Sequence, residues 1–169
     1  MSEPIRHIFP WREEESLTSG LPIRRPTVDV SVAGPFGTIG AKALIDTGSP
    51  RTVFPRGIGD LVGVSFPDLP SECPTAVIVL ERNWPCVTQQ VDLTLQPFGD
   101  LGWQADVDFA FDEGLPFGLL GLEGFLDRWA VSSNAYYGYF VVEPADSFHD
   151  AVPATALESF DRQWPGILP

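Results

Sequence analysis

The 169-residue chain contains only two cysteines, two histidines and one methionine. Cys73 and Cys86 are too few for a disulfide framework, and we expect both to be reduced thiols. His7 and His149 lie far apart, with none of the CxxC or HxxxH spacings that zinc sites use, and we expect both to be exposed. The sequence therefore predicts no metal site and no cofactor.

Basic residues are also scarce, because 10 Lys and Arg stand against 23 Asp and Glu, which gives a net charge of −13 at pH 7. A phosphate backbone is bound by a positively charged surface, so this balance argues against nucleic acid as a partner. No apolar run approaches the ~20 residues that span a membrane, and the first residues lack the apolar core of a signal peptide. We expect a cytoplasmic protein with no membrane partner.

Hydrophobic residues, by contrast, make up 44% of the chain and aromatic residues 12%, which is enough apolar mass to form a core. The 16 Gly and 17 Pro favour many short elements joined by turns over long helices. We predict one domain over residues 21–145, preceded by a polar N-terminal extension at 1–20 and followed by a tail at 146–169.

Alternating apolar residues predict an all-β, barrel-like core. In the strand at 106–111, the alternation places Asp106 and Asp108 on a solvated face, which argues against a calcium loop. The expected elements are strands at 28–32, 38–45, 75–80, 87–95, 106–111 and 136–142, and short helices at 123–129 and 155–163.

The segment with the clearest chemical signature is Ala43-Leu44-Ile45-Asp46-Thr47-Gly48-Ser49, in which an apolar strand runs into a carboxylate. Gly48 allows backbone N–H groups to approach that carboxylate, and Ser49 can hydrogen-bond its outer oxygen. A second pattern, Leu119-Leu120-Gly121, lies 75 positions further along the chain. Ser49 is in no Gly-x-Ser-x-Gly elbow, so a serine nucleophile is not indicated.

These two patterns, with a β-hairpin between them, resemble the active-site turn and the hydrophobic-hydrophobic-Gly motif of the retropepsin-like aspartic proteases over residues 27–143. The resemblance implies a closed barrel of short strands with one short C-terminal helix at 123–129. Asp-Thr-Gly occurs once in a chain too short for two lobes, so the resemblance also implies a homodimer to which each chain contributes one Asp46.

A member of this family would be an aspartic endopeptidase that hydrolyses polypeptides. Two carboxylates within hydrogen-bonding distance share one proton, so one acts as a base and the other as an acid. One Asp46 would take a proton from the attacking water while the other polarises the peptide carbonyl. The resemblance assigns Thr47 to hydrogen bonds between the two turns, Gly48 to contact with the substrate backbone and Ser49 to holding the carboxylate.

The hairpin at 75–95 takes the position of the family's flap, which folds over an extended substrate. A turn near Asn83 and Trp84 would place Cys86 opposite Glu81. The residues that we assign to substrate binding in the flap and cleft are Arg51, Arg82, Asn83 and Trp84.

Two departures from the family pattern keep a second interpretation open. The flap tip is bulkier and stiffer than the Gly-rich tips of many retropepsins. Leu122 stands where retroviral members carry Arg, so their ionic dimer contacts are absent and apolar terminal strands would substitute. The alternative is a catalytically inactive protein of the same fold that acts as a peptide-binding or protein-interaction module.

Overall fold

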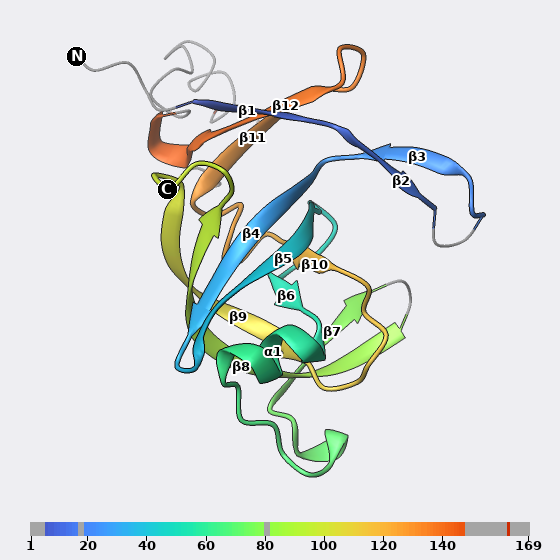
Figure 1. Cartoon of the computed structure of the whole chain (residues 1–169), viewed down its shortest axis with the longest axis vertical. Helices are drawn as coiled ribbons and strands as arrows, with labels where there is room; N and C mark the ends of the chain where they lie inside the picture. Colours follow the sequence, from blue (N-terminus) through green and yellow to red (C-terminus); the bar gives the residue numbers. More distant parts are fainter. Residues whose placement is uncertain (1–5, 17–18, 80–81, 148–161, 163–169) are drawn as a thin grey trace.

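The computed structural model describes residues 6–16, 19–79, 82–147 and 162, and strands dominate this part of the chain (Figure 1). The predicted all-β class is confirmed. Short helices α1 (Arg56–Val62) and η1 (Pro70–Glu72, a 3₁₀ helix) lie between β6 and β7. The strands are β1 (His7–Pro10), β2 (Arg12–Glu15), β3 (Pro22–Arg25), β4 (Thr27–Gly34), β5 (Gly37–Ile45), β6 (Val53–Phe54), β7 (Thr75–Val79), β8 (Arg82–Leu95), β9 (Gly102–Ala110), β10 (Gly118–Leu120), β11 (Trp129–Asn134) and β12 (Tyr139–Pro144).

Within the described residues, the main sheet has seven strands in the order β4-β5-β10-β6-β9-β8-β7. β4 pairs with β8 as well as with β5, so the sheet curls back on itself. Val28, Val30 and Val32 are fully buried along β4, because successive side chains of a strand point to opposite faces. Closure of the barrel stays a prediction, which the pairing of β4 with β8 supports.

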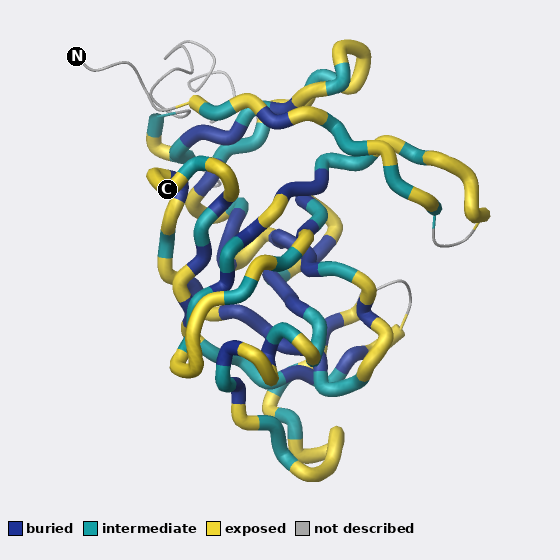
Figure 2. The backbone as a smooth tube through the Cα atoms, in the orientation of Figure 1, coloured by how far each residue is buried: buried dark blue, intermediate teal, exposed yellow. Residues whose placement is uncertain are grey.

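The buried side chains form two clusters. The larger cluster fills the curled sheet and contains the fully buried rings of Phe54, Phe109, Phe125 and Phe140. The smaller one lies beneath the hairpin β7–β8 and contains Trp84. Figure 2 shows that buried stretches gather in the middle of the molecule, whereas exposed stretches lie mainly at turns and ends.

Part of the predicted N-terminal extension forms strands. β1 pairs antiparallel with β12 in a sheet of order β1-β12-β11, and β2 and β3 form a separate two-stranded sheet (Figure 1). In β1, His7 Nε2 lies 3.1 Å from Asp100 Oδ2, and the imidazole centroid is 4.0 Å from that of Phe98. The expectation that His7 is exposed is wrong, since these contacts leave only 16% of its side chain accessible.

The prediction of a short helix at 123–129 is also wrong, because Glu123 forms a β-bridge with Arg51, residues 124–128 form turns, and Trp129 begins β11. Gly124 has a φ of +87°, which interrupts a right-handed helix. The strand predicted at 136–142 begins later than expected, because Tyr136 and Tyr137 lie in the turn between β11 and β12.

The helix predicted at 155–163, apart from Arg162, lies outside the described residues, as does His149. Among the residues that are described, no helix has the length and apolar character needed to cross a membrane.

Candidate active site

The Asp-Thr-Gly-Ser turn begins where β5 ends, and it lies beside the second sequence motif. β10 runs parallel to β5, with Leu120 paired to Ile45. The N–H of Asp46 then donates to the carbonyl of Leu120 at 3.1 Å. The fold therefore brings together two motifs that are far apart in the sequence.

Backbone N–H groups of the turn bind both the carboxylate and the main-chain carbonyl of Asp46. Gly48 N donates to Asp46 Oδ1 at 2.9 Å, and Ser49 N donates to the Asp46 carbonyl at 3.2 Å. Asp46 is half-buried, whereas Thr47 and Gly48 are exposed. The turn thus fixes the carboxylate and leaves the adjacent backbone free to meet another molecule.

Ser49 makes a different hydrogen bond from the one that the resemblance implies. Its side chain is buried, and Oγ donates to the carbonyl of Arg51 at 2.7 Å. The hydroxyl therefore fixes the chain after the turn, and the hydrogen bond to the carboxylate comes from Gly48.

Gly121 packs directly against the backbone of the active-site turn, which leaves no space for a side chain at this position. A Cβ at this position would lie 2.4 Å from the Arg51 carbonyl oxygen and 2.7 Å from that of Ser49. The N–H of Gly121 donates to Thr52 Oγ1 at 3.2 Å, and the N–H of Leu122 donates to the Ser49 carbonyl at 2.9 Å. Close backbone contact of this kind requires glycine.

Arg51 joins the active-site turn to a buried carboxylate. Its Nε lies 2.8 Å from Oδ2 of Asp108, which is completely buried, and Nη1 lies 3.7 Å from Glu123. Nε and Oδ2 are not aligned for a hydrogen bond, so the attraction is mainly between the charges. The prediction that Asp108 lies on a solvated face is wrong, because β6 and β8 pair with β9 on either side and Arg51 covers the carboxylate.

The same carboxylate reaches the base of the hairpin β7–β8. Thr88 Oγ1 donates to Asp108 Oδ1 at 2.5 Å, and Thr75 Oγ1 lies 3.4 Å from Thr88 Oγ1. A chain of polar contacts therefore runs from Arg51, after the active-site turn, to both strands of the hairpin. Strand alternation predicted an outward Asp108, and no signal in the sequence indicated that Arg51 and Thr88 would enclose it.

The hairpin has a different register from the predicted one. Val79 pairs with Arg82 and Thr75 pairs with Cys86, so Asn83 and Trp84 belong to β8 rather than to the turn. The predicted pairing of Cys86 with Glu81 is therefore wrong. Cys73 and Cys86 are both free thiols.

Three of the residues assigned to substrate binding lie at the start of β8. Trp84 is buried in the smaller core cluster, so we no longer assign it to substrate contact. Asn83 is exposed. The guanidinium of Arg82 lies 4.1 Å from the Trp84 ring centroid, and its Nη2 lies 3.2 Å from Asp112 Oδ2.

A polar hollow of about 340 Å³ includes Arg51 in its lining. It also contains Asp106, Glu123, Asp127 and Arg128, so charges of both signs surround the space. Within the described ranges, no group of three or more His, Cys, Asp or Glu side chains could hold a metal ion.

No protein-family model and no curated protein sequence matches this chain. Among solved structures, the fold is similar to that of a retropepsin-like aspartic protease from Rickettsia conorii, with a TM-score of 0.54 and 12% sequence identity. The match covers 84% of this chain and 93% of the other. At this identity the similarity shows the fold alone, so the chain has a retropepsin-like, all-β fold.

Proposed function

We propose that the chain is an aspartic endopeptidase in which Asp46 from each of two identical chains forms the catalytic dyad. The observation that carries this proposal is the hydrogen bond of 2.9 Å from Gly48 N to Asp46 Oδ1, in a turn that packs on Gly121. This arrangement orients one carboxylate beside exposed backbone, where a second copy can approach. The similarity of the fold to a retropepsin-like aspartic protease supports the same function.

A single carboxylate cannot supply both an acid and a base to one peptide bond, so the second copy is essential to the mechanism. When two carboxylates lie within hydrogen-bonding distance, they share one proton. The ionised Asp46 takes a proton from a water molecule as that water attacks the peptide carbonyl, and the protonated Asp46 donates a hydrogen bond to the carbonyl oxygen. We assign Thr47 to hydrogen bonds across the dimer and Gly48 to contact with the substrate backbone, roles that the exposure of both residues supports.

The proposed substrate is an extended polypeptide that lies between the active-site turn and the hairpin β7–β8. Extended chains bind proteins by adding a strand to an exposed edge. Arg82 and Asn83 lie at the turn end of β8, and Arg51 follows the active-site turn, so these three side chains would border the bound chain.

The first experiment measures cleavage of an unfolded protein from about pH 3.5 to 7, because a shared-proton dyad predicts activity on the acidic side of neutral. Asp46→Asn and a statine-type inhibitor should each abolish cleavage. Asp68→Asn, which changes an exposed carboxylate in a loop, is the matched control and should keep full activity. Equal cleavage by the wild type and Asp46→Asn would contradict the proposal.

A mixing experiment tests whether the dyad is shared between chains. Adding excess Asp46→Asn to a fixed amount of wild type should lower activity, because mixed dimers contain one carboxylate. Activity that is independent of the added variant would contradict a dyad formed by two chains.

One observation favours the alternative function, a peptide-binding or protein-interaction module. Arg82 is held by both Trp84 and Asp112, which restrains the end of the hairpin that would have to open for turnover. In that case both the wild type and Asp46→Asn would bind an unfolded polypeptide and leave it intact at every pH.

A further inference from the structure

We propose that the hairpin β2–β3, called the arm below, joins two copies of this chain by packing against the arm of the second copy. The inference rests on the proposed function, because it names the surface that assembles the Asp46 dyad. It concerns the two described strands, Arg12–Glu15 and Pro22–Arg25.

The arm has almost no core of its own. No residue of β2 or β3 is buried, and the two strands form a sheet separate from the main one. An isolated two-stranded hairpin is at best marginally stable in water. Leu21, at the end of the arm, is 64% exposed. A projecting element of this kind is stabilised when another surface covers it.

Polar contacts fix the base of the arm beside the active-site turn. Ile45 N, immediately before Asp46, donates to the carbonyl of Pro26, which directly follows β3. Arg12 binds Asp29 through two hydrogen bonds of 2.9 and 2.8 Å. Glu14 lies 3.2 Å from Lys42 Nζ on β5. The position of the arm is thereby tied to β5, the strand that leads into Asp46.

Symmetry then determines what the arm can contact. The dyad requires Asp46 and its copy to approach within hydrogen-bonding distance, so the two-fold axis passes beside the active-site turn. An element near such an axis meets its own symmetry copy, as in other isologous interfaces. Among the described strands, β1 and β12 pair with each other, whereas β2 and β3 pair only with one another beside this turn, so the arm is an element that a second copy can cover.

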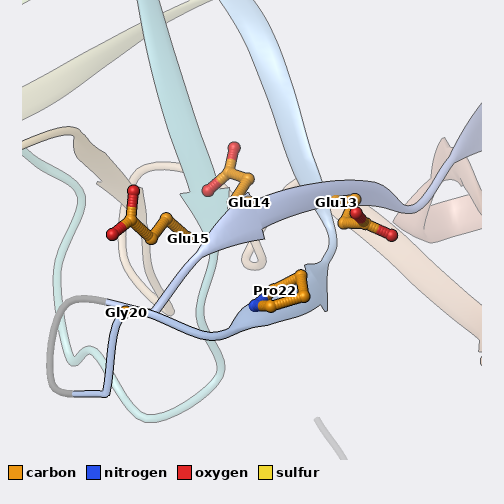
Figure 3. A pocket seen from close by; sticks show the side chains of 5 residues that line it. All are labelled: Glu13, Glu14, Glu15, Gly20 and Pro22. Carbon is orange, nitrogen blue, oxygen red and sulfur yellow. The ribbon is translucent and has the colours of Figure 1, made fainter.

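The arm carries charges of both signs, so the arms of two copies can be complementary to each other. A hollow of about 300 Å³ on its surface is lined by Glu13, Glu14, Glu15, Gly20 and Pro22 (Figure 3). Arg24 on the neighbouring strand is exposed. If two arms face each other, Arg24 of each copy can approach the exposed Glu13 and Glu15 of the other, and opposite charges across an interface favour correct pairing.

An exposed aromatic turn extends this surface. Trp11 N, just before β2, donates to the carbonyl of Gly138 at 2.8 Å, so the turn between β11 and β12 lies at the base of the arm. Tyr136 and Tyr137 in that turn are 87% and 72% exposed. Tyrosine is enriched in protein interfaces, so the second copy would also cover these rings.

The first test deletes residues 13–24 and joins Arg12 to Arg25 through Gly-Gly. Arg12 and Arg25 face each other in the ladder, so a two-residue turn closes the gap. We expect the dimer dissociation constant, measured by sedimentation, to rise about 30-fold or more. Cleavage should return at high protein concentration. A folded deletion variant that dimerises like the wild type would overturn the inference.

The second test exchanges charges that face each other across the arm, with Glu13→Arg and Arg24→Glu in one chain. Contact between two arms should survive this exchange, because both partners change together. A dissociation constant within about threefold of the wild type supports the inference. Weakening comparable to that of the deletion would place the arm against another part of the partner and overturn the contact between arms.

Asp46→Asn separates this inference from the proposed function. We expect this variant to dimerise normally without cleaving. A dimeric wild type that never cleaves would remove the proposed activity, while both arm variants would still test the interface by sedimentation. A wild type that stays monomeric even with the statine-type inhibitor would overturn the inference about the arm.

Discussion

The Nε atom of Arg51 lies 2.8 Å from Oδ2 of Asp108. This carboxylate lies on β9 of the main sheet and is completely buried. Arg51 follows the Asp-Thr-Gly-Ser turn by two positions, and Asp108 also accepts a hydrogen bond from Thr88 on β8. One buried charge therefore connects the candidate active site with the strand that forms half of the predicted flap.

Replacing Asp108 with Asn should destabilise the protein, because Arg51 loses its buried counter-ion. We expect the free energy of unfolding to fall by about 2–3 kcal/mol. This is less than the full cost of breaking a buried ion pair, because Arg51 is partly exposed. Urea unfolding measures this change. Glu123→Gln, which affects the more distant and exposed partner of Arg51, should cost less than about 0.5 kcal/mol. Equal effects of the two variants would contradict the assigned role of Asp108.

Gly121→Ala should disrupt the active-site turn, because the new methyl group would overlap the carbonyl oxygens of Arg51 and Ser49. Overpacking of this kind costs about 1–3 kcal/mol. Gly57→Ala in α1 is the matched control, since its Cβ would meet nothing within 4 Å. That variant should gain about 0.5–1 kcal/mol in unfolding free energy, as alanine favours a helix. A stable and fully active Gly121→Ala would show that the turn does not depend on this contact.

Stability should fall at alkaline pH because of Cys86. Burial raises the pKa of its thiol to about 12, so the native state keeps a proton that the unfolded chain loses. The contribution is fully present below the ordinary thiol pKa of 9.0, and it declines as the pH rises from there towards 12. Unfolding measured from about pH 7.5 to 10 should decline less in Cys86→Ala than in the wild type. Parallel curves for the two proteins would refute this assignment.

The attachment of the arm should persist over most of the acidic range proposed for the cleavage test. The hydrogen bonds from Arg12 hold the pKa of Asp29 below its ordinary value of 3.8. The resulting stability is present above about pH 4, and it is lost as the pH falls through the lower folded value. For this solvent-exposed pair we expect at most about 1 kcal/mol.

Unfolding measured from about pH 5 to 2.5 should show this contribution of Asp29 in the wild type and not in Asp29→Asn. Asp68→Asn serves as the control, because its carboxylate is exposed in a loop. The prediction fails if Asp29→Asn has the same pH dependence as the wild type.

Local sequence pattern predicted much of the main sheet. The alternation of Val28, Val30 and Val32 indicated a strand with one buried face, and the structure places all three in the core. The pattern at 123–129 predicted a helix, but Gly124 adopts a left-handed conformation there. The hairpin register was also mistaken, because strand pairing depends on which partners meet across the sheet rather than on the turn residues alone.

By itself, the sequence determined the chemical identity of the candidate site. An apolar strand that runs into Asp46-Thr47-Gly48-Ser49 places a carboxylate at a strand end through local preferences alone. Only the tertiary structure decided what surrounds it. Asp108 became a buried counter-ion of Arg51, and the chain that follows the hairpin β2–β3 came to be hydrogen-bonded to the end of β5, next to the active-site turn. These relationships depend on contacts between residues far apart in the chain, which local alternation and propensity do not encode.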